Sequence, residues 1–179
     1  WNSQSLPITI KVPASLQEYE AHILNAGEQW NTALGQPVFL FEFDAVGDNQ
    51  YATSSSSLAD EVFGLFRQRI WNFSTIGSTV LAYTSSLSQG NNIVHADIIF
   101  NFDTYLFADH DYPPVGVGEN YVDFESVLIH ELGHFLGLGH TSINEDLDSV
   151  MLPTLKKGAA RRELSYGDIE KIRSLYLRL

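Results

Sequence analysis

Three histidines in a short stretch of the sequence have the spacing of a metal site. His130 and His134 are four residues apart, so both imidazoles lie on one face of a helix and can bind one ion. Gly137 follows three residues later, and a glycine with positive φ there would turn the chain and bring back His140 as a third ligand. Glu131 directly follows the first histidine and can reach a water molecule on the metal. The pattern predicts a zinc site with one open coordination position.

The chemistry that these residues predict is hydrolysis. Three neutral imidazoles leave zinc its full positive charge, which lowers the pKa of a bound water towards about 7. Glu131 would take the proton of that water and deliver it to the leaving amine, while the metal polarises the scissile carbonyl. A five-residue match to such a motif often arises by chance, but here the third histidine and the glycine also have the required spacing. We therefore interpret His130, His134 and His140 as zinc ligands and Glu131 as the general base.

The motif lies in a helix that we expect to begin at or just before Asp123 and to end at Gly137 or Gly139. A last helix is expected from Ser165 to about residue 177, with a buried stripe of Ile169, Ile172, Leu175 and Tyr176. Residues 58–71 fit either a short helix or a strand, and residues 45–60 are loop-like. Strands rich in β-branched and aromatic residues are predicted at residues 6–12, 38–43, 79–84 and 93–102, the last two forming a hairpin through a turn at 89–92.

The first helix is predicted over residues 16–34. Ser15 is its expected N-cap, Glu18 would complete a capping box, and Gly35 would end it. An apolar stripe at helical spacing predicts the side that faces the core, and it consists of Tyr19, Ile23, Ala26, Trp30 and Leu34.

Composition favours one folded domain over residues 1–179. The hydrophobic fraction is 44%, the charged fraction is 18%, and there is no cysteine for a disulfide or thiolate site. The formal net charge of −12 argues against nucleic acid and anionic membranes as partners. No apolar run is long enough to span a membrane, and no signal peptide is visible. The first residue is Trp1 and not Met, which indicates a processed or trimmed form.

The zinc motif resembles that of the metzincins, in which HExxHxxGxxH is followed by a methionine beneath the metal. Here that methionine is Met151. Within this clan the sequence is most similar to a matrixin, a matrix-metalloproteinase-like catalytic domain, because Thr141 follows the third histidine and a Met-Leu-Pro sequence begins at Met151. Residues 164–176 resemble the last matrixin helix, and residues 96–100 resemble the strand that leads into the substrate cleft.

This resemblance implies an α+β fold with a twisted, mixed and mostly parallel sheet, three main helices, an active-site cleft and a Met-turn. It implies a secreted or extracytoplasmic zinc endopeptidase, which we expect to be monomeric, with an extended peptide or protein segment as its substrate. The segment would pair with an edge strand, beside the loop at 103–118. An apolar residue is expected after the scissile bond, in a pocket lined by Ser149, Val150, Leu152, Pro153, Thr154 and Leu155.

The sequence departs from the matrixin pattern at several places. Matrixins carry a second zinc and calcium ions before the active-site helix, but here the loop offers only Asp103, Asp109, His110 and Asp111. These residues could bind calcium, and a second zinc site is less expected. The favoured interpretation is that the carboxylates are solvated and bind no metal. Gly167 replaces one acid of the pair that braces the Met-turn, which leaves that role of Asp168 open. A longer connection from the third histidine to Met151 and an enlarged segment at 45–92 indicate a divergent microbial branch.

Two alternatives to a general endopeptidase remain open. One is a protease that processes a single target, and the other is a zinc-stabilised binding module without turnover. The intact Glu131 argues against the second, because a structural zinc site does not need a general base. After Met151, a basic cluster could attract acidic residues on the leaving-group side of a substrate, although a solvated loop is favoured. The cluster consists of Lys156, Lys157, Arg161 and Arg162.

Overall fold

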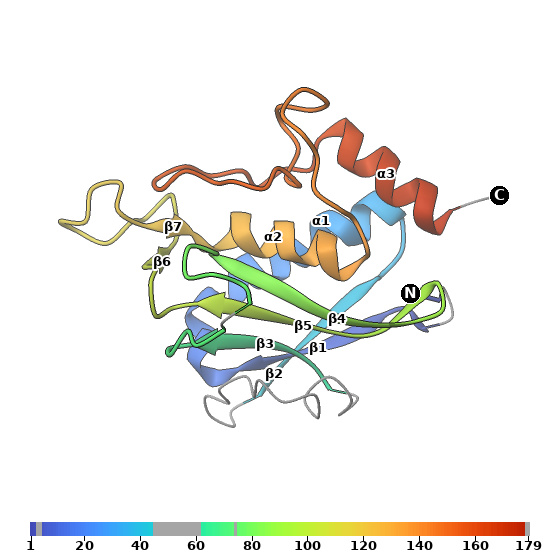
Figure 1. Ribbon diagram of the computed structural model, residues 1–179, viewed down its shortest axis with the longest axis horizontal. Coiled ribbons are helices and arrows are strands. Elements are labelled where there is room, and N and C mark those ends of the chain that lie inside the picture. Colours follow the sequence, from blue (N-terminus) through green and yellow to red (C-terminus); the bar gives the residue numbers. More distant parts are fainter. Residues whose placement is uncertain (3–4, 45–61, 74, 178–179) are drawn as a thin grey trace.

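A five-stranded sheet with the strand order β2-β1-β3-β5-β4 supports the molecule (Figure 1). The computed structural model describes residues 1–2, 5–44, 62–73 and 75–177. Four strands are parallel, and β4 runs antiparallel to β5 at one edge. Their bounds are Ile8–Pro13 (β1), Phe39–Asp44 (β2), Phe63–Gln68 (β3), Ala82–Gln89 (β4) and Asn92–Asn101 (β5). The hairpin prediction is confirmed, and Gly90 turns it with a φ of 62°.

The helices lie on one side of this sheet (Figure 1). They are α1 (Glu20–Leu34), α2 (Phe124–Phe135) and α3 (Tyr166–Tyr176), and the 3₁₀ helix η2 (Ala14–Tyr19) leads from β1 into α1. Two short parallel strands, β6 (Phe107–Ala108) and β7 (Val122–Asp123), precede α2. The predicted α+β fold, with a mixed, mostly parallel sheet and three main helices, is therefore confirmed. No helix among the described residues is long and apolar enough to cross a membrane.

The buried stripe of α1 agrees with the prediction. Trp30 lies at the centre of the core, and its indole N–H donates to the carbonyl of Ile129 in α2 at 3.1 Å. Phe100 of β5 stacks on Phe124 of α2 with 4.7 Å between ring centroids. Gly35 ends α1 with a φ of 67°. The other predicted positions of the stripe, Tyr19, Ile23, Ala26 and Leu34, are also buried.

The capping box at the start of the first helix is a wrong prediction. Ser15 lies inside η2 and makes no side-chain cap, and the α-helix begins only at Glu20. The cause is Arg67 of β3, whose guanidinium donates to the Ser15 carbonyl at 2.6 Å and to the Glu18 carboxylate at 2.8 Å. A contact with a distant strand thus replaces the local cap.

The remaining segments agree in part with their predictions. In the ambiguous stretch 58–71, β3 shows that the strand alternative holds for the described part, while 45–61 lie outside the described residues. Ser165 caps α3 as predicted and forms a capping box with Asp168. In the predicted stripe of α3, Ile172 is buried, Ile169 and Tyr176 are partly buried, and Leu175 is 45% exposed. The prediction for Leu175 is therefore wrong, because that side chain lies at the rim of a cleft.

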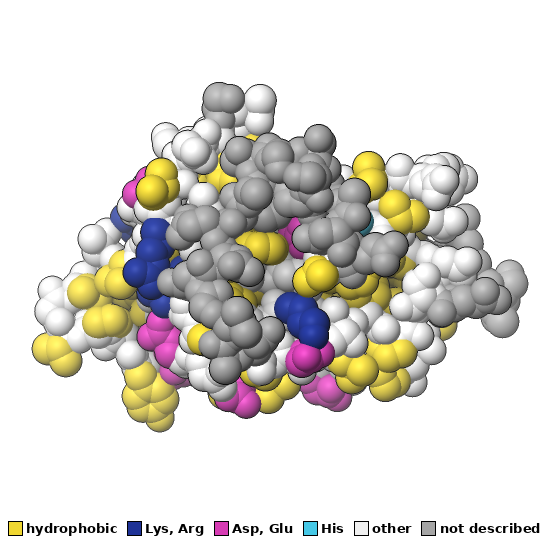
Figure 2. All heavy atoms as spheres, turned by 90° about the horizontal axis from the view of Figure 1, so that it is seen from below, with side chains coloured by type: hydrophobic (Ala, Val, Ile, Leu, Met, Phe, Trp, Pro, Cys, Tyr) yellow, Lys and Arg dark blue, Asp and Glu magenta, His cyan; other side chains and the backbone are white. Residues whose placement is uncertain are grey.

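On the face of the sheet that carries no helix, described charged side chains of opposite sign lie close together. Figure 2 shows acidic and basic side chains next to each other among hydrophobic ones on this face. Lys11 pairs with Glu42 on neighbouring strands, and both side chains are largely exposed. Such exposed pairs contribute little to stability. The charges that matter more for the fold lie around α2.

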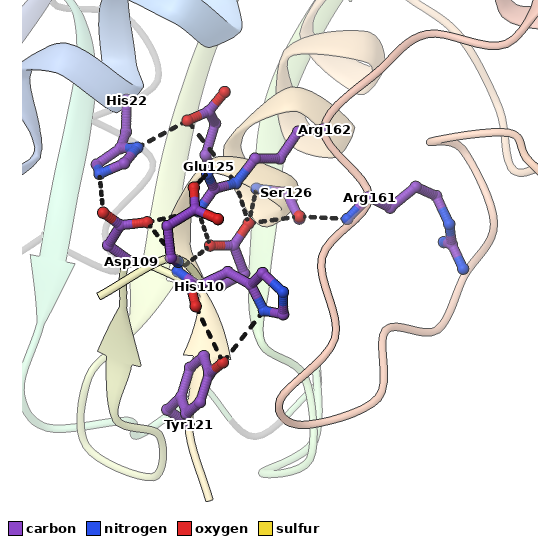
Figure 3. A network of polar contacts seen from close by, with 10 residues as sticks. His22, Asp109, His110, Tyr121, Glu125, Ser126, Arg161 and Arg162 are labelled. Carbon is purple, nitrogen blue, oxygen red and sulfur yellow. Dashed lines mark hydrogen bonds and ion pairs between the residues drawn. The ribbon is translucent and has the colours of Figure 1, made fainter. Parts of the chain in front are cut away.

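Arg162 joins the loop at 103–123 to the start of α2 (Figure 3). Its guanidinium donates to Asp109 and to Asp111 at 2.8 Å each, and it also binds Asp123. Asp123 is fully buried and is the N-cap of α2, where it accepts from the backbone N–H of Ser126 at 3.0 Å. One cation therefore fixes both the loop and the first turn of the helix that carries the histidines.

We predict that Arg162→Met lowers the free energy of unfolding by about 3 kcal/mol near pH 7, because the buried Asp123 loses its cation. Burial alone would raise the pKa of Asp109 and Asp123, but hydrogen bonds and charge from Arg162 outweigh it and hold both pKa values below the usual range. A lowered carboxyl pKa stabilises the protein above the unfolded value of about 3.9 and ceases to do so as the pH falls through the folded value.

Urea unfolding of both proteins should therefore show a difference that is full near pH 7 and shrinks below about pH 4. Lys156→Met, at an exposed position with no ion pair to the described residues, removes the same charge and should leave stability within about 0.5 kcal/mol. Equal stability of Arg162→Met and the unmodified protein near pH 7 would contradict the prediction.

Candidate metal centre and cleft

The three histidines converge at the C-terminal end of α2. The Nε2 atom of His134 lies 3.0 Å from that of His130 and 3.1 Å from that of His140. Potential ligand atoms of the three residues lie within 4.8 Å of one another, and no other group of three or more such residues is found among the described ones. His130 and His134 are partly buried, and His140 is exposed. The structure thus brings together all three predicted ligands.

The other ring nitrogens show which atoms face the centre. Nδ1 of His130 lies 2.8 Å from the carbonyl of Val150, and Nδ1 of His134 lies 2.8 Å from that of Leu138. A carbonyl only accepts, so both Nδ1 atoms carry protons and both Nε2 atoms present lone pairs. Two lone pairs facing each other at 3.0 Å repel unless a cation lies between them. The donor set therefore fits a metal ion, and histidine nitrogens suit zinc.

The imidazoles of His130 and His134 are also held in the neutral form that binds metal. Burial lowers the pKa of His130 to about 4, with further lowering by the neighbouring His134, by His140 and by the charge of Arg161. Burial is also the main cause that lowers the pKa of His134. Because a metal competes with protons for the same lone pairs, neutral rings are ready to bind at neutral pH.

The turn after α2 explains how the third histidine returns. Gly137 has a φ of 95°, its N–H donates to the His134 carbonyl at 2.8 Å, and the Leu138 N–H donates to the Gly133 carbonyl at 2.9 Å. This is a Schellman motif, which needs a residue with positive φ and therefore favours glycine. The helix ends here, as the sequence predicted, and the reversed chain places His140 opposite the other two rings.

Glu131 lies beside the centre and is almost completely buried. Burial raises the pKa of its carboxyl to about 7, and a hydrogen bond from Thr84 opposes part of this increase. The Thr84 hydroxyl, on edge strand β4, lies 2.7 Å from the carboxylate and 2.9 Å from the backbone carbonyl of Glu131. Sequence analysis did not identify Thr84, because nothing local relates it to a helix 47 residues away.

Met151 is completely buried and packs against α2 at Gly133. The turn that contains it is held by Asp168 of α3, which accepts from the Ser149 hydroxyl at 2.5 Å and from the Val150 N–H at 2.8 Å. On its other side, the Met151 carbonyl accepts from the Thr141 N–H at 2.9 Å. Asp168 thus braces the turn without the second acid that Gly167 replaces.

A cleft of about 1300 Å³ passes over the centre. One wall is formed by β4, including Ala82 and Thr84, and the histidines and Glu131 lie along it. Five of the six predicted pocket residues line the cleft, and Ser149 is placed differently, since it is fully buried and turned towards Asp168. The five are Val150, Leu152, Pro153, Thr154 and Leu155.

The acidic loop before α2 does not form a cluster of metal ligands. Asp109 and Asp111 bind Arg162, and Asp103 accepts from the backbone N–H of Trp71 at 3.0 Å. His110 contacts the hydroxyl of Tyr121 at 3.1 Å. The carboxylates that the sequence offered as calcium ligands are thus bound by Arg162 and by the backbone N–H of Trp71.

Comparison with known proteins identifies relatives of the same kind. The matrixin family model matches residues 14–177. Metalloendoproteinase 2-MMP of Arabidopsis thaliana is 34% identical over 118 residues, which are 59% of this chain and 30% of that protein. Metalloendoproteinase 4-MMP of the same plant is 47% identical over 97 residues, covering 54% of this chain and 25% of that protein. The chain thus matches less than a third of the length of these relatives.

Among solved structures, archaemetzincin from Methanopyrus kandleri has a similar fold. The TM-score is 0.57 at 14% sequence identity, and the match covers 96% of both chains. At this identity the likeness shows the fold alone.

We predict that Gly133→Ala lowers the free energy of unfolding of the zinc-free protein by about 2 kcal/mol. A Cβ at Gly133 would lie 2.3 Å from the Met151 sulfur and 3.1 Å from Trp30, so the buried methionine must shift. Gly139→Ala is the control, because its Cβ would meet no atom within 4 Å. Urea unfolding should separate the two variants, and competition with a chelator should show weaker zinc binding by Gly133→Ala. Equal unfolding curves for the two would sink the prediction.

Proposed function

The chain belongs to the matrixin family, and we propose that residues 1–179 form a single catalytic domain that acts as a zinc-dependent endopeptidase. The observation that carries this proposal is the meeting of three metal-facing imidazole nitrogens with the buried Glu131 in an open cleft. When bound, zinc would supply a Lewis acid that polarises a scissile carbonyl. It would also lower the pKa of water, so that the water loses a proton more easily and becomes a nucleophile near neutral pH.

In this mechanism Glu131 moves the proton. Its carboxylate accepts a proton from the attacking water and later donates it to the leaving amine. The raised pKa of about 7 suits a group that must both take and release a proton near neutral pH. Thr84 donates to one carboxylate oxygen and leaves the other oxygen for the water. Thr84 is therefore a positioning residue in this proposal.

The substrate in the proposal is an extended protein segment. β4 is an edge strand, so a peptide can lie along its free side by main-chain hydrogen bonds. The wall opposite is largely apolar and includes Val127, Leu152 and Leu155. This surface supports an apolar side chain after the scissile bond. We also propose that the protein acts as a secreted monomer, in keeping with the family resemblance.

A processing protease with a single target would have the same catalytic geometry, and a broad peptide library distinguishes it by the number of sequences cleaved. A binding module without turnover has no use for a buried carboxylate beside the metal, because keeping Glu131 charged there is unfavourable. The position of Glu131 therefore favours the enzyme.

We predict that Glu131→Gln binds zinc as well as the unmodified protein does, yet loses peptide cleavage by about 10³-fold. The amide keeps the shape of the side chain but cannot accept the proton. Cleavage of a quenched fluorescent peptide library, together with metal analysis for one zinc per chain, would measure both properties. A zinc chelator should abolish cleavage by the unmodified protein. Cleavage that persists in Glu131→Gln or in the chelator would overturn the proposed function.

We further predict that Thr84→Val lowers kcat about tenfold with little change in KM, because the Glu131 carboxylate loses the donor that orients it. Thr84→Ser keeps the hydroxyl and should restore most of kcat. The measurement is steady-state cleavage of one good library peptide by all three proteins. A rise in KM alone, or equal loss in the Ser and Val variants, would show that Thr84 only shapes the cleft.

A further inference from the structure

Two consecutive arginines after the Met-turn have different surroundings. Arg162 is enclosed by the carboxylates of Asp109, Asp111 and Asp123. The Arg161 guanidinium donates only to the backbone carbonyl of Thr154, at 3.4 Å, and no carboxylate among the described residues pairs with it. Figure 3 shows its side chain pointing away from the acidic network. Arg161 is partly buried, so its charge is incompletely hydrated. The described residues provide no counter-ion for it.

Arg161 lies in the wall of the catalytic cleft. Its backbone N–H donates to the Ser126 hydroxyl at 2.7 Å, and Ser126 is four residues before the metal-facing His130 on α2. Its guanidinium reaches Thr154, in the segment that follows the Met-turn. These two contacts place Arg161 where α2 and that segment approach each other, at the pocket proposed for the residue after the scissile bond.

The charge of the cleft is opposite to that of the chain. The formal net charge of the protein is −12. Among the described residues that line the cleft, Glu131 is the only acid, whereas Lys157 and Arg161 are both basic. Lys157 donates to the Asn120 amide oxygen at 2.7 Å and stays exposed at the rim. A partly desolvated cation beside apolar side chains such as Val127 and Leu155 favours a ligand with an apolar stem and an anionic end.

We propose that Arg161 is a specificity-determining residue that lets this pocket, which also accepts apolar side chains, favour glutamate over glutamine immediately after the scissile bond. This inference rests on the proposed endopeptidase function and extends it, because the walls accept the methylene stem and the guanidinium accepts the carboxylate. Glutamine has the same shape but lacks the charge, so the pocket discriminates between the two side chains by charge. Arginine binds carboxylates with two parallel hydrogen bonds, which adds direction to the attraction.

The test compares peptides that are identical except for Glu, Gln or Leu after the cleaved bond. The unmodified zinc-loaded protein should cleave the Glu peptide with a kcat/KM at least about tenfold above that of the Gln peptide. Arg161→Gln should bring the ratio close to one, and kcat/KM should fall much more for the Glu peptide than for the Leu peptide. Lys156→Gln is the matched control, since it removes the same charge from an exposed residue that does not line the cleft, and it should keep the ratio.

A charge reversal gives a second, independent variant. Arg161→Glu should invert the preference, so that a peptide with Lys at this position is cleaved better than one with Glu. Added salt should reduce the Glu-to-Gln ratio of the unmodified protein, because ions screen the attraction between the partly exposed guanidinium and the substrate carboxylate. Thermal unfolding of each variant confirms that the fold is retained before the ratios are compared.

A binding measurement separates this inference from the proposed function. Fluorescence anisotropy of labelled Glu and Gln peptides on the zinc-loaded Glu131→Gln variant reports the preference without cleavage, and the Glu peptide should bind at least about tenfold more tightly. Cleavage of the Leu peptide with equal treatment of Glu and Gln would overturn the role of Arg161 and leave the endopeptidase intact. Absence of all cleavage together with preferred binding of the Glu peptide would overturn the endopeptidase and retain the anion pocket.

Discussion

Three imidazole nitrogens must face one another with their lone pairs directed inward, and most of the C-terminal half of the chain serves this requirement. The Nε2 atoms lie 3.0 and 3.1 Å apart, and two of the rings are oriented by Nδ1–H bonds to backbone carbonyls. Such a cluster is unfavourable without a cation, because lone pairs at these distances repel each other. The surrounding backbone must therefore hold the rings in place until metal binds, and it does so through parts of the chain that are themselves fixed.

The support for His130 extends to the last helix. Its Nδ1–H donates to the Val150 carbonyl, and the N–H of Val150 donates to Asp168 at the start of α3. Asp168 also accepts from the Ser149 hydroxyl and from the Ser165 N–H. These hydrogen bonds satisfy a carboxylate that has no exposed surface. The capping box of α3 and the orientation of the His130 ring thus both depend on the Asp168 side chain.

Features of the site that depend on local spacing could be predicted from sequence. The i, i+4 histidines, the glycine turn and the apolar stripe of the first helix follow from helix geometry alone. Thr84, in contrast, reaches Glu131 only because β4 packs on α2, which no local pattern reveals. The predicted cap at Ser15 failed for the same reason, since Arg67 from β3 takes both the Ser15 carbonyl and the Glu18 carboxylate. Tertiary contacts override local preferences where a charged side chain arrives from another strand.

One contact at the start of α2 directs the two consecutive arginines to different surroundings. The Ser126 hydroxyl donates to Asp123 and accepts from the backbone N–H of Arg161. This contact holds the chain at the first turn of α2, so that Arg162 reaches the buried acids while Arg161 reaches the cleft (Figure 3). The acids around Arg162 are therefore paired, and Arg161 keeps its charge in the wall of the cleft.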